Sequence, residues 1–280
     1  MSDPCERVEA AAADGAVLVG CAHGGQVLGW TPAGTDRDRL WVSSKASCGH
    51  GAALRGGVPV IFPRFSSTEL PGGAGVPRHG LARDRSWELT AGRTATGAAQ
   101  LTARLRDDAA TAVLWPYRFT LTLTTVADGT RLAMTATVRN DGDQPLTFML
   151  ALHTYLAVGD AATATVHGLA GRTAVGNDDG VTRTLPADLL PAVGPIDLAV
   201  PGALAQVHPV RLVDPVLGDL ELTAEGLDDL VAWNPGPDHG LADVPPGGAS
   251  SFVCLEAARL TPVTVAAGRS WSGGQYLRTC

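Results

Sequence analysis

The stretch Phe119-Thr-Leu-Thr-Leu-Thr-Thr-Val126 alternates apolar and polar side chains along its whole length. A period of two is typical of a strand that buries one face and exposes the other. The segment Arg131-Leu-Ala-Met-Thr-Ala-Thr-Val-Arg139 repeats this pattern, and Asp128-Gly129 between the two runs is typical of a tight turn. Together these residues predict an antiparallel hairpin over 119–139, which a further turn at Asn140-Asp-Gly-Asp143 ends.

Strand patterns continue on both sides of this hairpin, separated by many of the 34 glycines and 19 prolines. The run Leu146–Val158 is apolar on both faces, which predicts a single strand buried between two layers. No segment shows a helical period over three turns, and we expect 170–205 to form long loops. Shorter strands are predicted at 163–167, 209–213, 218–223, 229–233, 251–256 and 262–265. The fold class is therefore all-β: a large antiparallel β-sandwich forming a single domain over residues 1–280.

Composition excludes several classes of function. With 45% hydrophobic residues the chain can form a sizeable core, and its net charge of −7 argues against nucleic-acid binding. No secretory signal and no run of about 20 apolar residues is present, so we expect no membrane partner. The five cysteines are odd in number, scattered and without a C-x-x-C pair, which favours reduced thiols in a cytoplasmic protein.

Two residues in apolar surroundings are candidates for proton transfer. His153 is either a core histidine with satisfied ring nitrogens or a proton donor that works near neutral pH. Glu256 follows Phe252-Val-Cys-Leu255, and a carboxylate among apolar residues is costly unless it is paired or functional. A buried salt bridge and a catalytic carboxylate are the two interpretations of Glu256.

A cluster of cations lies in the segment 55–83, and Arg55, Arg78 and Arg83 are its candidates for binding an anion. The alternative is a solvated basic loop. Against that alternative, Gly56-Gly57 beside Arg55 allows the backbone to approach a ligand closely, and the planar guanidinium group suits phosphate oxygens.

Other chemistries receive little support from the sequence. There is no P-loop motif for a nucleotide and no G-x-S-x-G elbow for a nucleophilic serine. Cys48, His50, His79 and His153 could be drawn together as zinc ligands, but their spacing matches no established zinc pattern. We therefore expect no metal and no cofactor.

Several motifs follow one another along the chain, within the range from about residue 15 to 275. They are Arg55-Gly-Gly-Val-Pro-Val-Ile-Phe-Pro63, His79-Gly-Leu-Ala-Arg83 followed by Trp87, Ala151-Leu-His-Thr-Tyr155, Trp233-Asn-Pro235, and the strand that carries Glu256. In these motifs the chain resembles the glucose-6-phosphate 1-epimerases, the hexose-6-phosphate mutarotase branch of the aldose 1-epimerase superfamily. The two motifs within 55–83 are the most specific to this branch.

The resemblance implies a galactose-mutarotase-like sandwich. It also implies interconversion of the α and β anomers of a hexose 6-phosphate, with glucose 6-phosphate as the main candidate. It implies that His153 protonates the ring oxygen and that Glu256 takes the proton of the anomeric hydroxyl. Arg55 and Arg83 match the substrate-binding arginines, and Asp197 falls where a residue that binds a sugar hydroxyl is found. His79 and Trp233 are expected to line the pocket. The expected partner is a small sugar phosphate, and the expected state is a monomer.

The chain departs from the family pattern in places. Arg78 stands where a glutamine or small residue often precedes the His-Gly pair, and Arg64 follows Phe62-Pro63. The extra arginines could strengthen phosphate binding or favour another phosphosugar. Two alternatives remain at this stage: an aldose 1-epimerase that acts on free sugars, and a carbohydrate-binding sandwich without catalytic activity.

Overall fold

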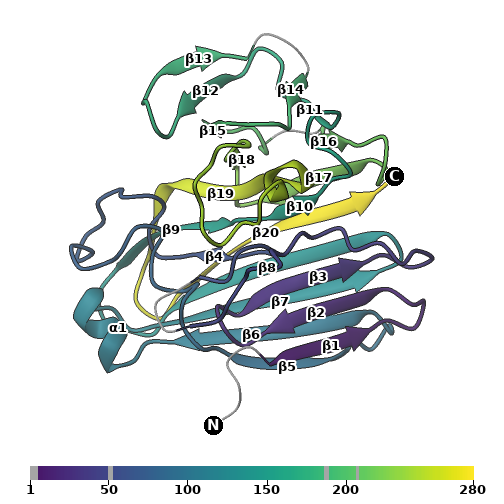
Figure 1. Cartoon of the computed structure of the whole chain (residues 1–280). Coiled ribbons are helices and arrows are strands. Elements are labelled where there is room, and N and C mark those ends of the chain that lie inside the picture. Colours follow the sequence, from purple (N-terminus) through teal and green to yellow (C-terminus); the bar gives the residue numbers. More distant parts are fainter. Residues whose placement is uncertain (1–5, 50–52, 186–188, 206–207) are drawn as a thin grey trace.

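The computed structural model describes residues 6–49, 53–185, 189–205 and 208–280, and these residues form three antiparallel sheets (Figure 1). The largest sheet has the order β14-β11-β16-β17-β20-β8-β7-β6-β5, formed in that order by Leu189–Pro191, Thr165–His167, Val210–Val213, Leu220–Glu225, Ser270–Thr279, Arg131–Asn140, Phe119–Asp128, Ala99–Arg106 and Glu88–Arg93. The second has the order β13-β12-β15-β18-β19-β9-β4, formed by Thr182–Thr184, Thr173–Gly176, Ile196–Val200, Asp229–Asn234, Phe252–Val265, Leu146–Leu152 and Val60–Ile61, with β10 (Tyr155–Ala157) also paired to β19. The smallest contains β1 (Arg7–Ala11), β2 (Val17–Cys21) and β3 (Gln26–Thr31).

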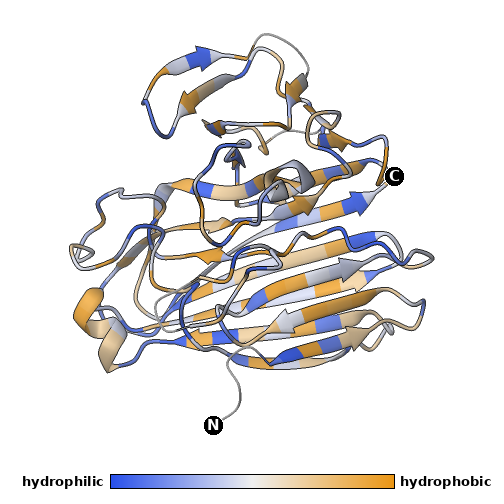
Figure 2. Ribbon diagram, in the orientation of Figure 1, coloured by the Kyte–Doolittle hydropathy of each residue, from blue (hydrophilic) through white to orange (hydrophobic). Residues whose placement is uncertain are grey.

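The predicted hairpin is present as β7 and β8. Its register runs from Phe119 opposite Asn140 to Asp128 opposite Arg131, so the turn lies at the predicted Asp128-Gly129. The apolar residues of both strands are buried and the intervening residues are more exposed. Figure 2 shows the same alternation of hydrophobic and hydrophilic residues along the strands of this sheet. The period of two was therefore a correct signal for the fold class.

The main core lies between the two large sheets. Phe62, Trp115, Phe119 and Phe148 meet there, with ring centroids 5.3–5.4 Å apart where Phe62 contacts the other three. Aromatic side chains contribute the largest buried areas in such a core. Phe62 also connects this core to the candidate site, because the backbone N–H of Leu81 donates to its carbonyl oxygen at 2.8 Å.

Some predicted elements are wrong in detail. The expected loops at 170–205 contain β12, β13, β14 and β15, whose short strands have too few residues to show a period. The strand expected at 262–265 is the end of β19, which continues through an irregularity between Arg259 and Val263. The helix α1 (Ala109–Leu114) and the 3₁₀ helix η1 (Gly248–Ser251) are likewise too short to produce a detectable helical pattern.

The expected single strand over Leu146–Val158 is also wrong, because the structure divides it into two strands that share one register. The chain leaves the sheet at His153 and Thr154, between β9 and β10. Both of these strands pair with β19, with Leu152 opposite Ala257 and Tyr155 opposite Cys254. The two residues of the break therefore lie beside Leu255 and Glu256, and the backbone N–H of Leu255 donates to the carbonyl of Thr154 at 3.1 Å.

Two further findings concern expectations from composition. In the part of the chain that the structure describes, no helix is both long and apolar enough to cross a membrane. Cys254 and Cys280 carry free thiols, but Cys48 is disulfide-bonded, so the prediction of reduced thiols is wrong at that residue. Cys5 lies outside the described residues.

Gly80 provides a test of how the site segment is held against the core. Its φ is +82°, and a Cβ atom there would overlap the carbonyl group of Phe62. We predict that Gly80→Ala lowers the free energy of unfolding by more than about 2 kcal/mol, because left-handed strain and a backbone clash add. Gly34 is the matched control, since its φ is +78° and a Cβ atom there would meet no other described atom within 4 Å. Gly34→Ala should lower the free energy of unfolding by only about 1 kcal/mol, with urea titration as the measurement for both variants. Equal losses of unfolding free energy in the two variants would contradict the role of the clash.

Candidate functional site

A cavity of about 370 Å³ lies where the break between β9 and β10 meets the loops of 55–83. Its lining includes all seven site residues predicted from the sequence: Arg55, Arg78, His79, Arg83, His153, Asp197 and Glu256. These residues are separated by up to 201 positions in the chain, counted from Arg55 to Glu256. Their convergence in one cavity is what a binding site for a small molecule requires.

The second large sheet positions the acidic residues of this cavity. Asp197 on β15 is opposite Trp233 on β18, which is opposite Cys254 on β19. Glu256 lies two residues beyond Cys254 and so projects from the same face of the sheet. The sheet thus presents Asp197, Trp233 and Glu256 along one diagonal.

His153 and Glu256 form a close buried pair. The Nε2 atom of His153 lies 3.3 Å from Oε1 of Glu256, and their side chains are 12% and 2% exposed. Within the described structure, Nδ1 of His153 and Oε2 of Glu256 have no hydrogen-bond partner. Buried polar atoms are rarely left unpaired, so these two atoms are candidates for contact with a ligand.

Burial determines the protonation state of this pair. It raises the pKa of Glu256 well above its usual range, and the neighbouring Asp197 raises that pKa further while Arg83 opposes the change. Burial also lowers the pKa of His153 well below its usual range, with His79, Arg83 and Arg55 adding to the effect. Burial therefore favours the neutral form of both groups, with a neutral imidazole on His153 and a carboxylic acid on Glu256.

Aromatic side chains hold the His153 ring in place. Tyr155 stacks on it with centroids 4.9 Å apart and an interplanar angle of 10°, and Trp233 meets it edge to face at 5.9 Å. The backbone N–H of His153 donates to the carbonyl of Pro59 at 3.0 Å. The ring can therefore transfer a proton without first being ordered by a ligand.

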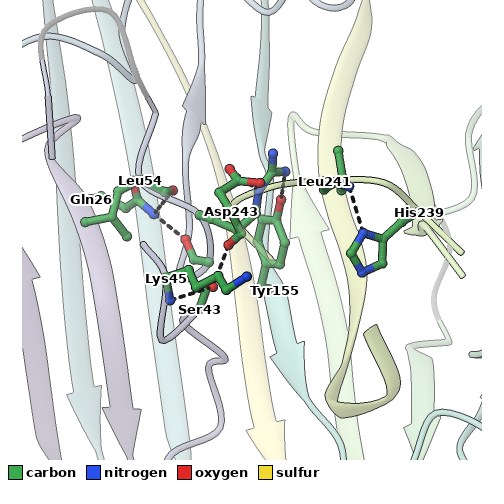
Figure 3. Close-up of polar contacts among 10 residues, drawn as sticks. Gln26, Ser43, Lys45, Leu54, Tyr155, His239, Leu241 and Asp243 are labelled. Atoms are coloured by element: carbon green, nitrogen blue, oxygen red, sulfur yellow. Dashed lines mark hydrogen bonds and ion pairs between the residues drawn. The ribbon is translucent and has the colours of Figure 1, made fainter. Parts of the chain in front are cut away.

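Arg55 is oriented by two partners that sequence reasoning missed. Its Nε donates to Asp243 at 2.9 Å, and an η nitrogen donates to the Tyr155 hydroxyl at 2.9 Å. Figure 3 shows Tyr155 and Asp243 in this network, where the Ser43 hydroxyl donates to the Asp243 carbonyl at 2.6 Å. Asp243 offers no motif of its own, so only its position in the fold connects it with the site.

Arg83 and Arg78 differ from Arg55 in this respect. Neither guanidinium group forms an ion pair or a hydrogen bond with any other described residue. Unpaired arginines that face a partly enclosed cavity are suited to bind an anion, particularly one with several oxygen atoms. Arg64 does not share this role, because it donates to the carbonyls of Val76 and Ser67 and so holds its own loop together.

His79 and Asp197 complete the predicted set. His79 has a φ of +65°, an unpaired buried Nδ1 and a ring 6.5 Å from that of His153. Burial, with Arg83, Arg78 and Arg55, lowers its pKa to about 3, so it is neutral near pH 7. Asp197 accepts a hydrogen bond from Asn177 Nδ2 at 2.5 Å, and burial raises its pKa. Asn177, which also lines the cavity, had no signal in the sequence.

The zinc arrangement drawn from the sequence can be checked for part of the chain. Among the described residues, no group of three His, Cys, Asp or Glu side chains could hold a metal ion. His50 lies outside the described residues.

Comparisons with known proteins agree on the family. Residues 7–278 match the family described as aldose 1-epimerase. A protein of Salmonella typhimurium named "Putative glucose-6-phosphate 1-epimerase" is 29% identical over 243 residues, which cover 85% of this chain and 78% of the relative. An Escherichia coli protein with the same name is 30% identical over 244 residues, covering 84% of this chain and 77% of the relative.

Solved structures agree on the fold. The structure described as a "putative mutarotase" from Salmonella typhimurium superposes with a TM-score of 0.84 at 25% identity, covering 100% of this chain and 92% of that one. A galactose mutarotase-like protein from Lactobacillus casei superposes with a TM-score of 0.78 at 15% identity, covering 98% and 100%. The predicted galactose-mutarotase-like sandwich is thus confirmed.

The raised pKa of Glu256 predicts a pH-dependent contribution to stability. Because the folded state binds this proton more tightly than the unfolded state, wild-type stability should fall as pH rises from about 4.5 towards the raised value. Glutamine does not titrate, so the Glu256→Gln variant should not lose stability in this way. Its free energy of unfolding should rise relative to that of wild type by at least about 1.4 kcal/mol across that pH range. Urea unfolding at several pH values measures the difference. Glu225→Gln, an exposed change on β17, is the control, and parallel curves for wild type and Glu256→Gln would contradict the assignment.

Proposed function

The chain belongs to the aldose 1-epimerase family, and we propose that it interconverts the α and β anomers of a hexose 6-phosphate, with glucose 6-phosphate as the main candidate. The observation that carries the proposal is one cavity that combines a proton-transfer pair with unpaired arginines, in a protein whose net charge is −7. A free-sugar epimerase needs the pair but has no use for the arginines. A protein that only binds carbohydrate needs neither.

The pair has the geometry for acid–base opening of a pyranose ring. Glu256 removes the proton of the anomeric hydroxyl while His153 protonates the ring oxygen, and the bond between C1 and the ring oxygen breaks to give the open aldehyde. Rotation about C1–C2 presents the other face of the carbonyl, and the reverse proton transfers close the ring as the other anomer. The two reacting oxygens are both bonded to C1, so two groups whose nearest atoms are 3.3 Å apart can serve them together.

The remaining residues bind and orient the sugar in this proposal. Arg83 and Arg55 hold the phosphate, and Arg78 at the more exposed rim adds a third donor. Asp197 and Asn177 accept and donate hydrogen bonds to sugar hydroxyls. His79, being neutral, can donate or accept a single hydrogen bond without adding charge. The chain acts on its substrate as a monomer and without a cofactor in this proposal.

Removing either member of the pair tests the proton-transfer roles. We predict that Glu256→Gln and His153→Ala each lower the catalysed rate by about 10²–10⁴-fold, the usual contribution of a general acid or base. Equilibration of α-glucose 6-phosphate, followed by NMR or polarimetry, measures the rate. Circular dichroism serves as the control for folding. A folded variant that keeps more than about a tenth of the wild-type rate would remove that residue from the mechanism.

Arg83 tests the choice of substrate. A charge-assisted hydrogen bond contributes about 1.5–3 kcal/mol, so Arg83→Ala should lower kcat/KM for glucose 6-phosphate by roughly 10- to 150-fold. The loss on free glucose should be much smaller, because free glucose has no phosphate to lose. Arg64→Ala is the matched control, since Arg64 lies in the same segment but bonds its own loop. Equal losses on both substrates would mean that Arg83 shapes the pocket without binding phosphate.

A further inference from the structure

Burial favours a protonation state of the pair that the proposed chemistry does not use. The proposed reaction needs a protonated His153 and an ionised Glu256, whereas side chains that are only 12% and 2% exposed favour neutral imidazole and carboxylic acid. The 3.3 Å separation lets one proton move between the two residues without any movement of the chain. What decides the position of that proton is therefore the electrostatic potential at each end of the pair.

Charges around the pair are distributed unevenly. On the His153 side, Arg55 donates to the hydroxyl of Tyr155, whose ring stacks on the imidazole at 4.9 Å. On the Glu256 side, Asp197 projects from the same face of the sheet, two strands away. Arg83 acts on both members, lowering the pKa of each. Cations at one end and a carboxylate at the other oppose an ion pair with its positive end on His153.

The other titratable groups near the pair do not reverse this field. Burial raises the pKa values of Tyr155 and Cys254, so both are neutral near pH 7. Asp243 is paired with Arg55, and His79 is neutral. Arg78 also lines the cavity and acts on both His79 and Asp197, and Asp178 lines the cavity beside Asp197.

We propose that the phosphate group of the substrate switches this pair into its working form: a dianion bound by the arginines draws the shared proton from Glu256 to His153. The inference rests on the proposed function and extends it, because the phosphate then acts in the chemical step and not only in binding. One proton moves from Oε1 to Nε2, and the total charge of the pair is unchanged. A neutral sugar in the same cavity leaves the pair in its inactive form.

The switch is tested with free glucose and phosphite dianion added as two separate molecules, so that no covalent bond joins the anion to the sugar. Saturating phosphite should accelerate mutarotation of free glucose by the enzyme at least about tenfold, the change in a protonation equilibrium that corresponds to one pKa unit. Potassium chloride at the same ionic strength is the control for screening, and Arg83→Ala should abolish the acceleration. Inhibition by phosphite, or no effect at concentrations that bind, would overturn the proposal.

A second measurement follows the proton itself. In ¹⁵N-histidine-labelled protein, the ring signal of His153 is identified by its loss in His153→Gln. It should change from neutral to protonated when 1,5-anhydroglucitol 6-phosphate binds, and stay neutral with saturating 1,5-anhydroglucitol. Neither 1,5-anhydroglucitol nor its 6-phosphate has an anomeric hydroxyl, so neither compound can react. His208, which is exposed, serves as the internal control. A neutral His153 in the phosphorylated complex would overturn the switch.

The two proposals fail in different ways. If glucose 6-phosphate is not epimerised faster than glucose, the proposed function is wrong, whatever the state of His153. If glucose 6-phosphate is strongly preferred but phosphite does not activate and His153 remains neutral in the complex, only the switch is wrong.

Discussion

The contact between His153 and Glu256 depends on how one strand, β19, pairs with two others. Because β9 and β10 pair with β19 in the same register, the two residues between them lie opposite Leu255 and Glu256. An imidazole is thereby placed 3.3 Å from a carboxyl group that is almost inaccessible to solvent. The register is the same on both sides of the break, so His153 is held opposite Glu256, where cross-strand side chains lie within contact distance.

Burying these two groups is unfavourable, and the sandwich tolerates it because most of its interior is apolar. The interior between the two large sheets is dominated by Leu, Val, Ala and aromatic side chains. This rigidity also serves the chemistry, because Tyr155 and Trp233 fix the imidazole ring before any ligand arrives. The unpaired atoms of His153 and Glu256 are consistent with a site that exchanges some stability for function.

In the proposed function, the arginines allow an acidic protein to favour an anionic ligand. Most of the acidic side chains are not buried, whereas Arg55, Arg78 and Arg83 all line the cavity. Arg55 is held by Asp243 and Tyr155, so its guanidinium plane is already set and little order has to be gained on binding. Arg64, an extra arginine in the same segment, donates from both η nitrogens to loop carbonyls.

The fold class follows from the sequence alone, because a period of two over 119–139 favours this hairpin wherever one face is buried. Motifs also identified seven of the residues that line the cavity, since the residue types needed to bind phosphate and move protons are few. Three other features became visible only in the folded chain. They are the break in the strand at His153, the short strands within 170–205, and the hydrogen bond from Arg55 to Asp243, which is 188 residues away. The physical reason is that these features arise from strand pairing and long-range contacts, which leave no periodic trace in the local sequence.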